Sequence, residues 1–467
     1  MTTAVGALAL TADFVAHASG GRLISGNPRT VFENVSTDTR SLGAGALFIA
    51  LRGERFDGHA FVPEAVGKGA GGLLVSDAVP APGQAAVIQV PDTLLGLQKL
   101  AREVRRRSVA RVVAITGSAG KTTTKEITAE LLGARYRVFR NRGNLNNHIG
   151  LPLSLLELRH DVDVAVVELG MNHAGEIRTL VQIAEPDIRM WTNVGDAHIG
   201  FFGTREAVAD AKAEILEHPT PGTVVVANAD DDLVMAHVNR FAGRRITFGE
   251  SREATVRASN IVDNGLEGSS ADVETPAGRL RLTARLPGRA QMLNVLAGVA
   301  VAMELGVGVN AIQTRVESFR PLTRRGSMRT SPAGARVVDD SYNASPAAMR
   351  AMLAALAATP TSGRRIAVLG EMLELGASAR ALHADCGRAA ASAHVDELVV
   401  VGGPAADGLA EGAEAAGVPR AHIHRFADSA AAASFVAPLV GPDDLVLVKG
   451  SRGTRTDVIA DRLMEAA

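Results

Sequence analysis

A glycine-rich segment, residues 116–124 (TGSAGKTTT), has the residue types that bind a polyphosphate. The apolar run 110–115 predicts a buried strand before this segment, and residues 121–132 predict a helix after it. Gly117 and Gly120 allow backbone N–H groups to approach phosphates closely, and the helix adds about half a positive charge at its N-terminus. In such a loop the lysine reaches the outer phosphates, and the next hydroxyl binds Mg²⁺. The strict pattern G-x-x-x-x-G-K-[ST] is not met, because Ile115 stands where its first glycine should be. We therefore predict a variant phosphate loop made of Gly117, Ser118, Ala119, Gly120, Lys121, Thr122 and Thr123.

Two further side chains stand where a metal ion beside such a loop is held. Glu168 ends the apolar run 163–168, and His198 follows the apolar run 188–194. The carboxyl ends of parallel strands meet at one edge of a sheet, so both residues are expected beside the phosphate loop. A lone histidine is usually not a ligand, but this placement favours a ligand role for His198.

Other polar segments of the first half allow both a functional and a structural interpretation. The run 141–150 (NRGNLNNHIG) has four asparagines, and it predicts either a binding loop that includes Asn146 and Asn147 or an ordinary structural loop. Lys212 lies within a predicted helix over residues 204–218, where a lysine is ordinarily solvated. The turn after the first predicted strand could bind a nucleotide or be only a hydrogen-bonded turn; it contains Thr37, Asp38, Thr39 and Arg40.

The last third of the chain repeats the arrangement of a buried strand followed by polar residues. Residues 339–343 (DDSYN) follow the predicted strand 336–338, and residues 370–376 (GEMLELG) follow the strand 365–369. Residues 449–452 (KGSR) follow the strand 444–448. Ligands of wound sheets gather at such strand ends, so we expect these residues to face a ligand.

The elements that position these residues alternate between short apolar strands and helices, which predicts mostly parallel, wound sheets. We expect an α/β protein of three domains. Residues 1–92 form a small α/β domain, residues 93–320 a central P-loop domain that binds a mononucleotide, and residues 321–467 a Rossmann-like wound sheet without a G-x-G-x-x-G fingerprint. The helix 94–107 is expected to link the first two domains, with a solvated basic face.

Composition excludes several other classes of protein. The chain has 467 residues, 46% of them hydrophobic, and a net charge of −1, so we expect no nucleic-acid or membrane partner. Its one cysteine, Cys386, rules out a disulfide within the chain and disfavours a zinc-cysteine site. The N-terminus has no basic region, and the apolar run 295–309 is too short to span a bilayer. We expect a cytoplasmic enzyme that acts as a monomer.

With these motifs placed, the chain resembles the Mur ligase family along essentially its whole length. The variant loop TGxxGKT is typical of this family and of folylpolyglutamate synthases. The run 45–59 is similar to two members of the family, and the stretches 144–152, 339–346 and 370–376 are more selective for the member that adds a dipeptide. The resemblance implies a cytoplasmic ligase that uses ATP and Mg²⁺, forms an acyl phosphate, and joins D-alanyl-D-alanine to UDP-N-acetylmuramoyl-tripeptide in peptidoglycan precursor synthesis.

The resemblance also assigns roles to residues. Lys121, His198 and Lys212 are the expected catalytic residues, and Lys212 is similar to a carbamylated lysine of the family. Thr122, Glu168, His198 and Lys212 are the expected Mg²⁺ residues. The expected nucleotide contacts outside the loop are Asn294, Arg325 and Asp340; Arg324, adjacent to Arg325, is an alternative, and Ala290–Gln291 departs from the family's usual His-Asn. The expected substrate contacts are Thr37, Asp38, Thr39, Arg40, Asn146, Asn147, Asn343, Lys449, Ser451 and Arg452.

Two alternatives stay open at this point. The first is a related ligase that adds a single amino acid; its diaminopimelate-adding form commonly carries an Asp-Asn-Pro-Arg motif that is absent here, and folate ligases lack the first domain. The second is a nucleotide-binding regulator or scaffold without catalysis, which the presence of Lys121, Glu168, His198 and Lys212 disfavours. Release of ADP that depends on both substrates would separate these alternatives.

Overall fold

The computed structural model describes residues 8–53, 56–79, 83–141, 143 and 145–465. It divides into two compact units, which are considered separately. The first unit comprises Met1–Ile115, Arg135–Arg189 and Glu214–Thr223, and the second comprises Thr116–Ala134, Met190–Ala213 and Val224–Ala467. The predicted domain boundaries after residues 92 and 320 stay predictions. Four residues of the motifs above lie outside the described residues, namely Glu54, Arg55, Arg142 and Asn144.

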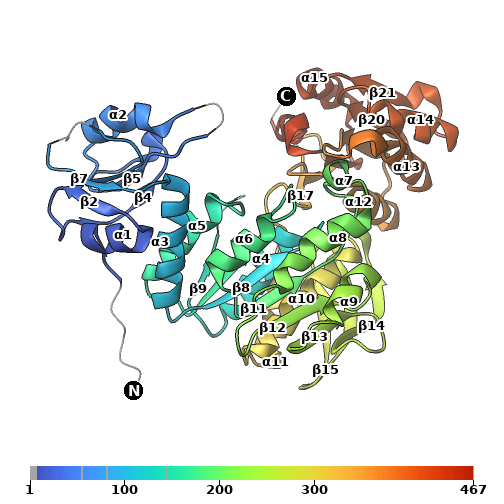
Figure 1. Cartoon of the computed structure of the whole chain (residues 1–467). Helices are drawn as coiled ribbons and strands as arrows, with labels where there is room; N and C mark the ends of the chain where they lie inside the picture. The colour runs from blue at the N-terminus through green and yellow to red at the C-terminus, as the bar shows by residue number, and fades with distance from the viewer. Residues whose placement is uncertain (1–7, 54–55, 80–82, 142, 144, 466–467) are drawn as a thin grey trace. The chain divides into compact units, whose positions relative to one another are not determined.

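The N-terminal part of the first unit is an α/β layer, drawn in blue in Figure 1. Its sheet has the order β2-β7-β6-β5-β4, with bounds Arg22–Ser25, Ala86–Gln89, Gly72–Val75, Leu47–Ile49 and Val35–Ser36. Strands β4 to β7 are parallel, β2 is antiparallel to β7, and helix α2 (Val62–Gly67) contributes to one core with Phe48 and Leu73. The prediction of one strand over residues 30–35 is wrong. The segment divides into β4 and a short strand β3 (Val31–Phe32), which pairs with β1 (Leu10–Thr11) ahead of helix α1 (Ala12–Ser19).

The rest of the first unit contains the strand that leads to the phosphate loop. Strand β8 (Arg111–Thr116) is parallel to β10 (Val164–Glu168), which is parallel to β9 (Val138–Arg140). All of β10 and most of β8 are buried, as their β-branched composition predicts. The helices of this part are α3 (Thr93–Arg107), α5 (Gly150–Leu155) and α6 (Glu176–Ala184).

Helix α3 corrects one expectation, because its basic end is not simply solvated. Arg105 is only 9% exposed, and its guanidinium donates to the Ala184 carbonyl at 2.9 Å and to Asp187 Oδ2 at 2.8 Å. Arg102 and Arg106 both lie 2.8 Å from the Glu185 carboxylate. The arginines therefore fix the end of α6, whose last residues would otherwise leave carbonyls unpaired.

The second unit begins with helix α4 (Lys121–Leu132), which starts and ends where the sequence predicts. Its strands β12, β13 and β14 are parallel, and β15 and β16 extend them as antiparallel strands. Their bounds are Val224–Asn228, Arg244–Gly249, Val256–Asp263, Ser269–Thr275 and Gly278–Ala284. The helices are α8 (Arg205–Ala213), α9 (Asp232–Val238), α10 (Ala290–Glu304) and α11 (Val309–Ser318). The predicted helix 204–218 is too long, because α8 ends at Ala213 and a 3₁₀ turn, Glu214–Leu216, follows.

The C-terminal part of the second unit, orange to red in Figure 1, is the predicted wound sheet. Its strand order is β17-β18-β22-β19-β20-β21, and all neighbours are parallel except β17 and β18. The bounds are Ser327–Thr330, Arg336–Asp340, Leu445–Lys449, Arg365–Gly370, Glu397–Val401 and Ile423–Phe426. Helices α12 (Pro346–Ala358), α13 (Ala379–Ser392) and α14 (Asp407–Ala415) share one core, and α15 (Ser429–Leu439) and α16 (Asp457–Arg462) share another. Asp339 and Asp340 lie inside β18, not after it as predicted.

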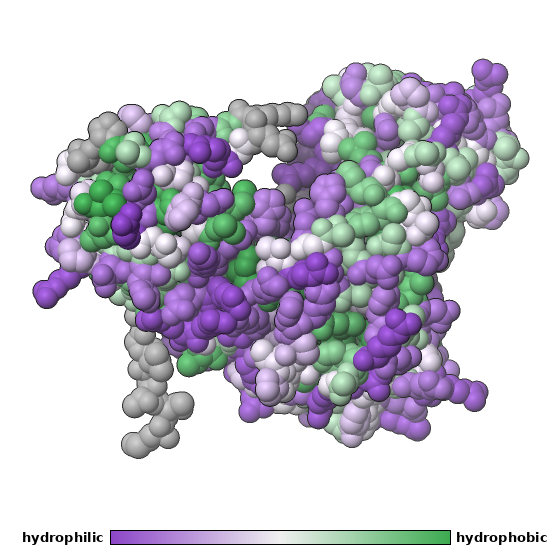
Figure 2. All heavy atoms as spheres, in the orientation of Figure 1, coloured by the Kyte–Doolittle hydropathy of each residue, from purple (hydrophilic) through white to green (hydrophobic). Residues whose placement is uncertain are grey.

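Within the described residues, no helix is long and apolar enough to cross a membrane. On the face shown in Figure 2, hydrophilic and apolar residues are interspersed. This mixture fits the balanced charge of the sequence.

Candidate active site

The phosphate loop has the strand, turn and helix that the sequence predicts. Gly117 has φ 153° and Gly120 has φ 80°, values that side chains other than glycine rarely adopt. A Cβ at Gly117 would overlap the Thr192 hydroxyl, and a Cβ at Gly120 would overlap the Asn294 side chain. Both glycines are therefore required by close packing as well as by backbone conformation.

A second strand end braces the loop. The Thr192 hydroxyl donates to the Ala119 carbonyl at 3.0 Å, and Asn193 Nδ2 donates to the same carbonyl at 3.0 Å. Asn193 Oδ1 accepts from the Ala119 N–H at 2.9 Å, and Ser118 Oγ accepts from the Gly195 N–H at 2.9 Å. Thr192 and Asn193 are not among the residues predicted from the sequence, although both follow β11 (Ile188–Trp191) directly. Their hydrogen bonds to Ala119 fix the backbone of the loop, so the loop is preorganised for a ligand.

Lys121 and Asn294 lie at the N-terminus of α4. Lys121 Nζ donates to the Gly117 carbonyl at 2.7 Å, so the lysine folds over the loop that it is expected to serve. Asn294, on α10, accepts from Thr124 Oγ1 at 3.1 Å and donates to Gln291 Oε1 at 2.7 Å. Gln291 therefore orients Asn294. Position 291 is the one at which the resemblance would lead us to expect an asparagine. The helix N-terminus favours an anion at this place.

His198 is the N-cap residue of α7 (Ile199–Phe202) and has the left-handed φ of 66°. Its Nδ1 lies 2.7 Å from Glu374 Oε2, in the segment after β19. Burial lowers the pKa of His198, the Glu374 carboxylate raises it, and the positive charges of Lys121 and Lys212 lower it. The net pKa is lower than usual, so the imidazole is favoured in its neutral, ligand-competent form. Of the three predicted catalytic residues, Lys121 and Lys212 both lie within electrostatic reach of His198.

Lys212 is 1% exposed near the end of α8, so the interpretation as a solvated surface lysine is wrong. Buried lysines are rare unless they are paired or modified. Its burial beside His198 favours a role in the site.

In the C-terminal sheet, three of the predicted ligand residues meet. Lys449 Nζ lies 2.6 Å from Asp340 Oδ2 and donates to the Asn343 carbonyl at 3.0 Å. Ser451 Oγ accepts from the Leu373 N–H at 3.0 Å, which fixes the segment after β19. Asn343 itself is exposed, so a substrate could reach its side chain.

The two adjacent arginines of this region are used differently. Arg324 lies 2.8 Å from both Asp457 and Asp461 of α16. The Arg325 guanidinium stacks 4.0 Å from the centroid of the Tyr342 ring, and Arg452 lies 5.9 Å from the same centroid. Arg324 is thus engaged in ion pairs, whereas Arg325 is presented on an aromatic ring. Tyr342, which sequence analysis did not single out, is part of the segment 339–343.

In the first unit, one asparagine of the asparagine-rich segment contacts a predicted site residue, and another has a structural role. Asn146 Nδ2 donates to Glu168 Oε1 at 2.9 Å, so these two predicted site residues meet. Asn147 Oδ1 accepts from the N–H groups of Ile149 at 3.2 Å and Gly150 at 2.8 Å, which is a structural role at the start of α5. Glu168 is 5% exposed, and a carboxylate so buried requires hydrogen bonds or a cation.

The turn that contains Thr37 is held by contacts between its own residues. Arg40 Nη2 lies 2.7 Å from Asp38 Oδ2, and hydrogen bonds from Arg40 lower the pKa of Asp38 to about 2. The Thr39 carbonyl accepts from Lys68 Nζ at 2.9 Å. The hydrogen-bonded-turn interpretation therefore describes this structure, and nucleotide binding by the turn stays a prediction.

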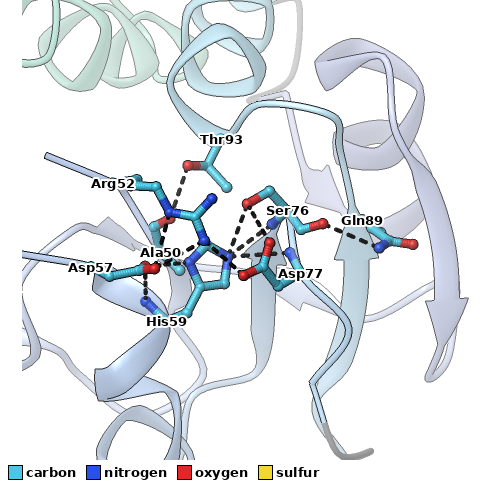
Figure 3. A network of polar contacts seen from close by, with 8 residues as sticks. All are labelled: Ala50, Arg52, Asp57, His59, Ser76, Asp77, Gln89 and Thr93. Atoms are coloured by element: carbon cyan, nitrogen blue, oxygen red, sulfur yellow. Dashed lines mark hydrogen bonds and ion pairs between the residues drawn. The ribbon is translucent and has the colours of Figure 1, made fainter.

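Figure 3 shows another polar network at the strand ends of the N-terminal sheet. His59 Nδ1 lies 2.6 Å from Asp57 Oδ1, and His59 Nε2 accepts from the Ser76 N–H at 2.9 Å. Asp57, His59 and Asp77 are close enough to share a cation. Arg52 already lies 2.9 Å from Asp57 and 2.7 Å from Asp77, so its guanidinium supplies the positive charge. The network is a structural one that fixes the segment after β5.

Three family models match the chain. The model described as Mur ligase family, catalytic domain, matches residues 31–105. The Mur ligase middle domain matches residues 115–302, and the Mur ligase, glutamate ligase domain, matches residues 324–452.

Relatives match over nearly the whole chain. The UDP-N-acetylmuramoyl-tripeptide–D-alanyl-D-alanine ligase of Bacillus subtilis is 33% identical over 441 residues, which cover 94% of each chain. A crystal structure of MurF from Acinetobacter baumannii has a TM-score of 0.89 and 33% identity, with 99% of this chain and 100% of that chain covered. The MurF ligase of Thermotoga maritima in complex with ADP has a TM-score of 0.80 and 30% identity, with 92% and 97% covered.

Proposed function

The chain belongs to the Mur ligase family, and we propose that it joins D-alanyl-D-alanine to UDP-N-acetylmuramoyl-tripeptide with conversion of ATP to ADP and phosphate. The whole-length similarity to ligases of that name carries this conclusion. The braced phosphate loop with Lys121 supports the proposal, because such a reaction needs a site for the phosphates of ATP. The protein thus acts in peptidoglycan precursor synthesis and cell wall biogenesis.

The chemistry follows from the poor reactivity of a carboxylate toward an amine. The terminal carboxylate of the tripeptide attacks the γ-phosphorus of ATP, the bond to the β-phosphate oxygen breaks, and ADP leaves. The dipeptide's amine then attacks the acyl phosphate, loses a proton, and displaces inorganic phosphate, which leaves an amide. Loop N–H groups and Lys121 offset the charge of the two anions that must meet.

The donor set fits Mg²⁺, which prefers oxygen ligands and accepts imidazole less often. Thr122 and His198 are the residues of the second unit that would hold it, and a role for the buried Glu168 of the first unit stays a prediction from the sequence. Mg²⁺ would screen the phosphate charge and polarise the transferred phosphoryl group.

The remaining ligand roles are assigned by chemistry. Asn294 and Arg325 would bind the nucleotide, the arginine with its guanidinium presented on Tyr342. Asp340 acts with them through Lys449, which holds its carboxylate. Ser451 and Arg452 would shape the acceptor side, and Asn146 and Asn343 would contact the muramyl peptide. The turn from Thr37 to Arg40 would bind the uridine diphosphate once Arg40 leaves Asp38.

The substrates are small molecules. We place the reaction in the cytoplasm, where ATP and the nucleotide precursor are available, and we propose that the protein acts as a monomer.

The test is a comparison of acceptors. Purified protein is given ATP, Mg²⁺ and UDP-N-acetylmuramoyl-tripeptide with D-alanyl-D-alanine, diaminopimelate, lysine or D-alanine, and ADP and the ligated product are both measured. We expect product with the dipeptide only, and no ADP release without an acceptor and a muramyl substrate. Product from UDP-N-acetylmuramoyl-dipeptide with a single amino acid, tested in parallel, and none from the tripeptide with D-alanyl-D-alanine would instead establish the tripeptide-forming activity. Absence of ligation with every acceptor would refute the proposal.

A further inference from the structure

The contact between His198 and Glu374 joins two segments that lie far apart in sequence. His198 is the N-cap of α7, and Glu374 precedes the 3₁₀ turn Gly376–Ser378 after β19. The two side chains approach with Nδ1 of the histidine 2.7 Å from Oε2 of the glutamate. Both residues have a left-handed φ of 66°, a conformation that a non-glycine residue adopts only when its surroundings impose it.

The backbone around the pair is clamped. The Gly200 N–H donates to the Glu374 carbonyl at 3.0 Å. A Cβ at Gly200 would lie 2.6 Å from the Gly376 nitrogen, and Gly376 itself has φ 56°. Only glycine at both positions allows the segments to approach this closely. The close approach of the two backbones therefore holds the side chains of His198 and Glu374 together. A chance contact between two flexible surface side chains would not require glycine at both positions.

The segment that carries Glu374 is held from its other side as well. The Leu373 N–H donates to Ser451 Oγ at 3.0 Å, and the Ser451 N–H donates to the Glu371 carbonyl at 3.2 Å. Glu374 is thus fixed relative to the segment that begins with Lys449. A carboxylate on a fixed backbone can determine the orientation of its imidazole partner.

Nδ1 of His198 is buried and makes no well-aligned hydrogen bond, so its 2.7 Å approach to Oε2 of Glu374 is a close charge contact. A carboxylate oxygen this close repels a nitrogen lone pair and attracts an N–H, which favours the proton on Nδ1 and the lone pair on Nε2. That tautomer is the one able to bind a cation through Nε2, and the carboxylate makes the nitrogen a stronger donor. We propose that Glu374 is a positioning residue that keeps His198 in the Nδ1–H tautomer with Nε2 available to the metal. The inference rests on the proposed function, which requires a metal at His198. It adds that a residue of the C-terminal sheet prepares a ligand on the phosphate-loop side.

The competing explanation is an ion pair that only ties two segments together. Such a tie would change stability without changing the tautomer of His198 or its affinity for metal. The variants Glu374→Ala and Glu374→Gln separate the two. The glutamine keeps an oxygen that can face Nδ1–H, whereas the alanine does not. Glu411→Ala is the matched control, since it removes an exposed glutamate 2.5 Å from Arg380 on the same sheet domain.

Two measurements are made on the full-length protein without either substrate. The first is the ¹⁵N spectrum of histidine-labelled protein, with the His198 signals assigned by comparison with His198→Gln. The second is titration with Mn²⁺ alone, followed by electron paramagnetic resonance. Thermal unfolding of each variant is recorded in parallel.

We expect the Nδ1–H tautomer at His198 in the wild type and in Glu374→Gln, and a mixture of tautomers in Glu374→Ala. We expect the Mn²⁺ affinity of Glu374→Ala to fall about tenfold or more, with a smaller loss in Glu374→Gln and no change in Glu411→Ala. If Glu374→Ala unfolds, the tautomer of His198 in the wild type and the Mn²⁺ affinity of Glu374→Gln still test the inference. An Nε2–H tautomer in the wild type, no Mn²⁺ binding by the wild type, or equal affinity in wild type and Glu374→Ala would overturn the inference. These readouts are independent of the ligation assay, whose failure would instead refute the proposed function.

Discussion

Lys449 and Asp340 are direct partners on neighbouring parallel strands, and their side chains form a buried ion pair. The two residues stand opposite each other in the register of β22 and β18, with Nζ 2.6 Å from Oδ2. Lys449 is 2% exposed, and its Nζ also donates to the Asn343 carbonyl at 3.0 Å. The pair therefore fixes the end of β18 and the segment that follows it.

Removing one partner of this pair should destabilise the protein strongly. Lys449→Met leaves the Asp340 carboxylate without its cation, and we expect the free energy of unfolding to fall by about 3 kcal/mol. The double variant Asp340→Asn with Lys449→Met should recover at least half of that loss, because no isolated charge is left buried. Urea unfolding of the wild type, both single variants and the double variant measures the coupling. Additive losses would show that the pair is not coupled.

The two adjacent arginines should respond differently to substitution. Arg325→Ala should raise the KM for ATP about tenfold or more, because a charged hydrogen bond to the nucleotide is lost. Arg324→Ala should leave that KM unchanged and lower the free energy of unfolding by about 1 kcal/mol, because partly exposed ion pairs with α16 are lost. Steady-state kinetics and urea unfolding of both variants test this. The reverse pattern would assign the nucleotide contact to Arg324.

Lys121→Ala should reduce kcat at least about 10²-fold while the fold is kept. The variant removes positive charge from the transferring phosphoryl group and loses little packing, since Lys121 is the first residue of α4 and is only half-buried. ADP release and thermal unfolding are measured on the same preparation. Substantial remaining turnover in a folded variant would contradict the phosphate-loop assignment.

Lys212 should be carbamylated in the active protein. A free buried ammonium beside a metal site would repel Mg²⁺, whereas a carbamate is an anion that could help to orient it. Lys212→Ala should lose most of its turnover and regain part of it when short carboxylic acids such as acetate are added. Lys212→Arg, which keeps the charge and cannot be carbamylated, should not be rescued. Full activity of Lys212→Ala would exclude the modification as a requirement.

Asp163 should contribute stability that is lost in acid. Hydrogen bonds from Arg137 lower the pKa of Asp163 from 3.8 to about 2. A lowered folded-state pKa means that the contribution is complete above the unfolded-state pKa and is lost as the pH falls toward the folded-state pKa. The difference in unfolding free energy between the wild type and Asp163→Asn should therefore shrink as the pH is lowered from about 5 to about 3. Unfolding curves across this range test it, and a constant difference would contradict it.

Local sequence determined the helices, because their hydrogen bonds join residues that are only a few positions apart. Helix α4 has the bounds predicted, and the phosphate loop lies between the predicted strand and helix. Helical hydrogen bonds join residues four apart, so the signal for them is contained in a short window of sequence. The family resemblance added the reaction, because motif spacing alone leaves several ligases possible.

The tertiary structure decided how these motifs are used. Nothing in a local pattern brings Glu374 to His198, or Thr192 to Gly117, because each pair joins segments that are separate in sequence and meet only when the sheets form. The same holds for the burial of Lys212, since a helix pattern does not state what packs on each face. Arg324 and Arg325 are adjacent and chemically equal in the sequence. A left-handed backbone at Arg324, with φ 62°, accompanies its ion pairs with α16, while Arg325 lies on Tyr342, and only the folded backbone sets those two directions.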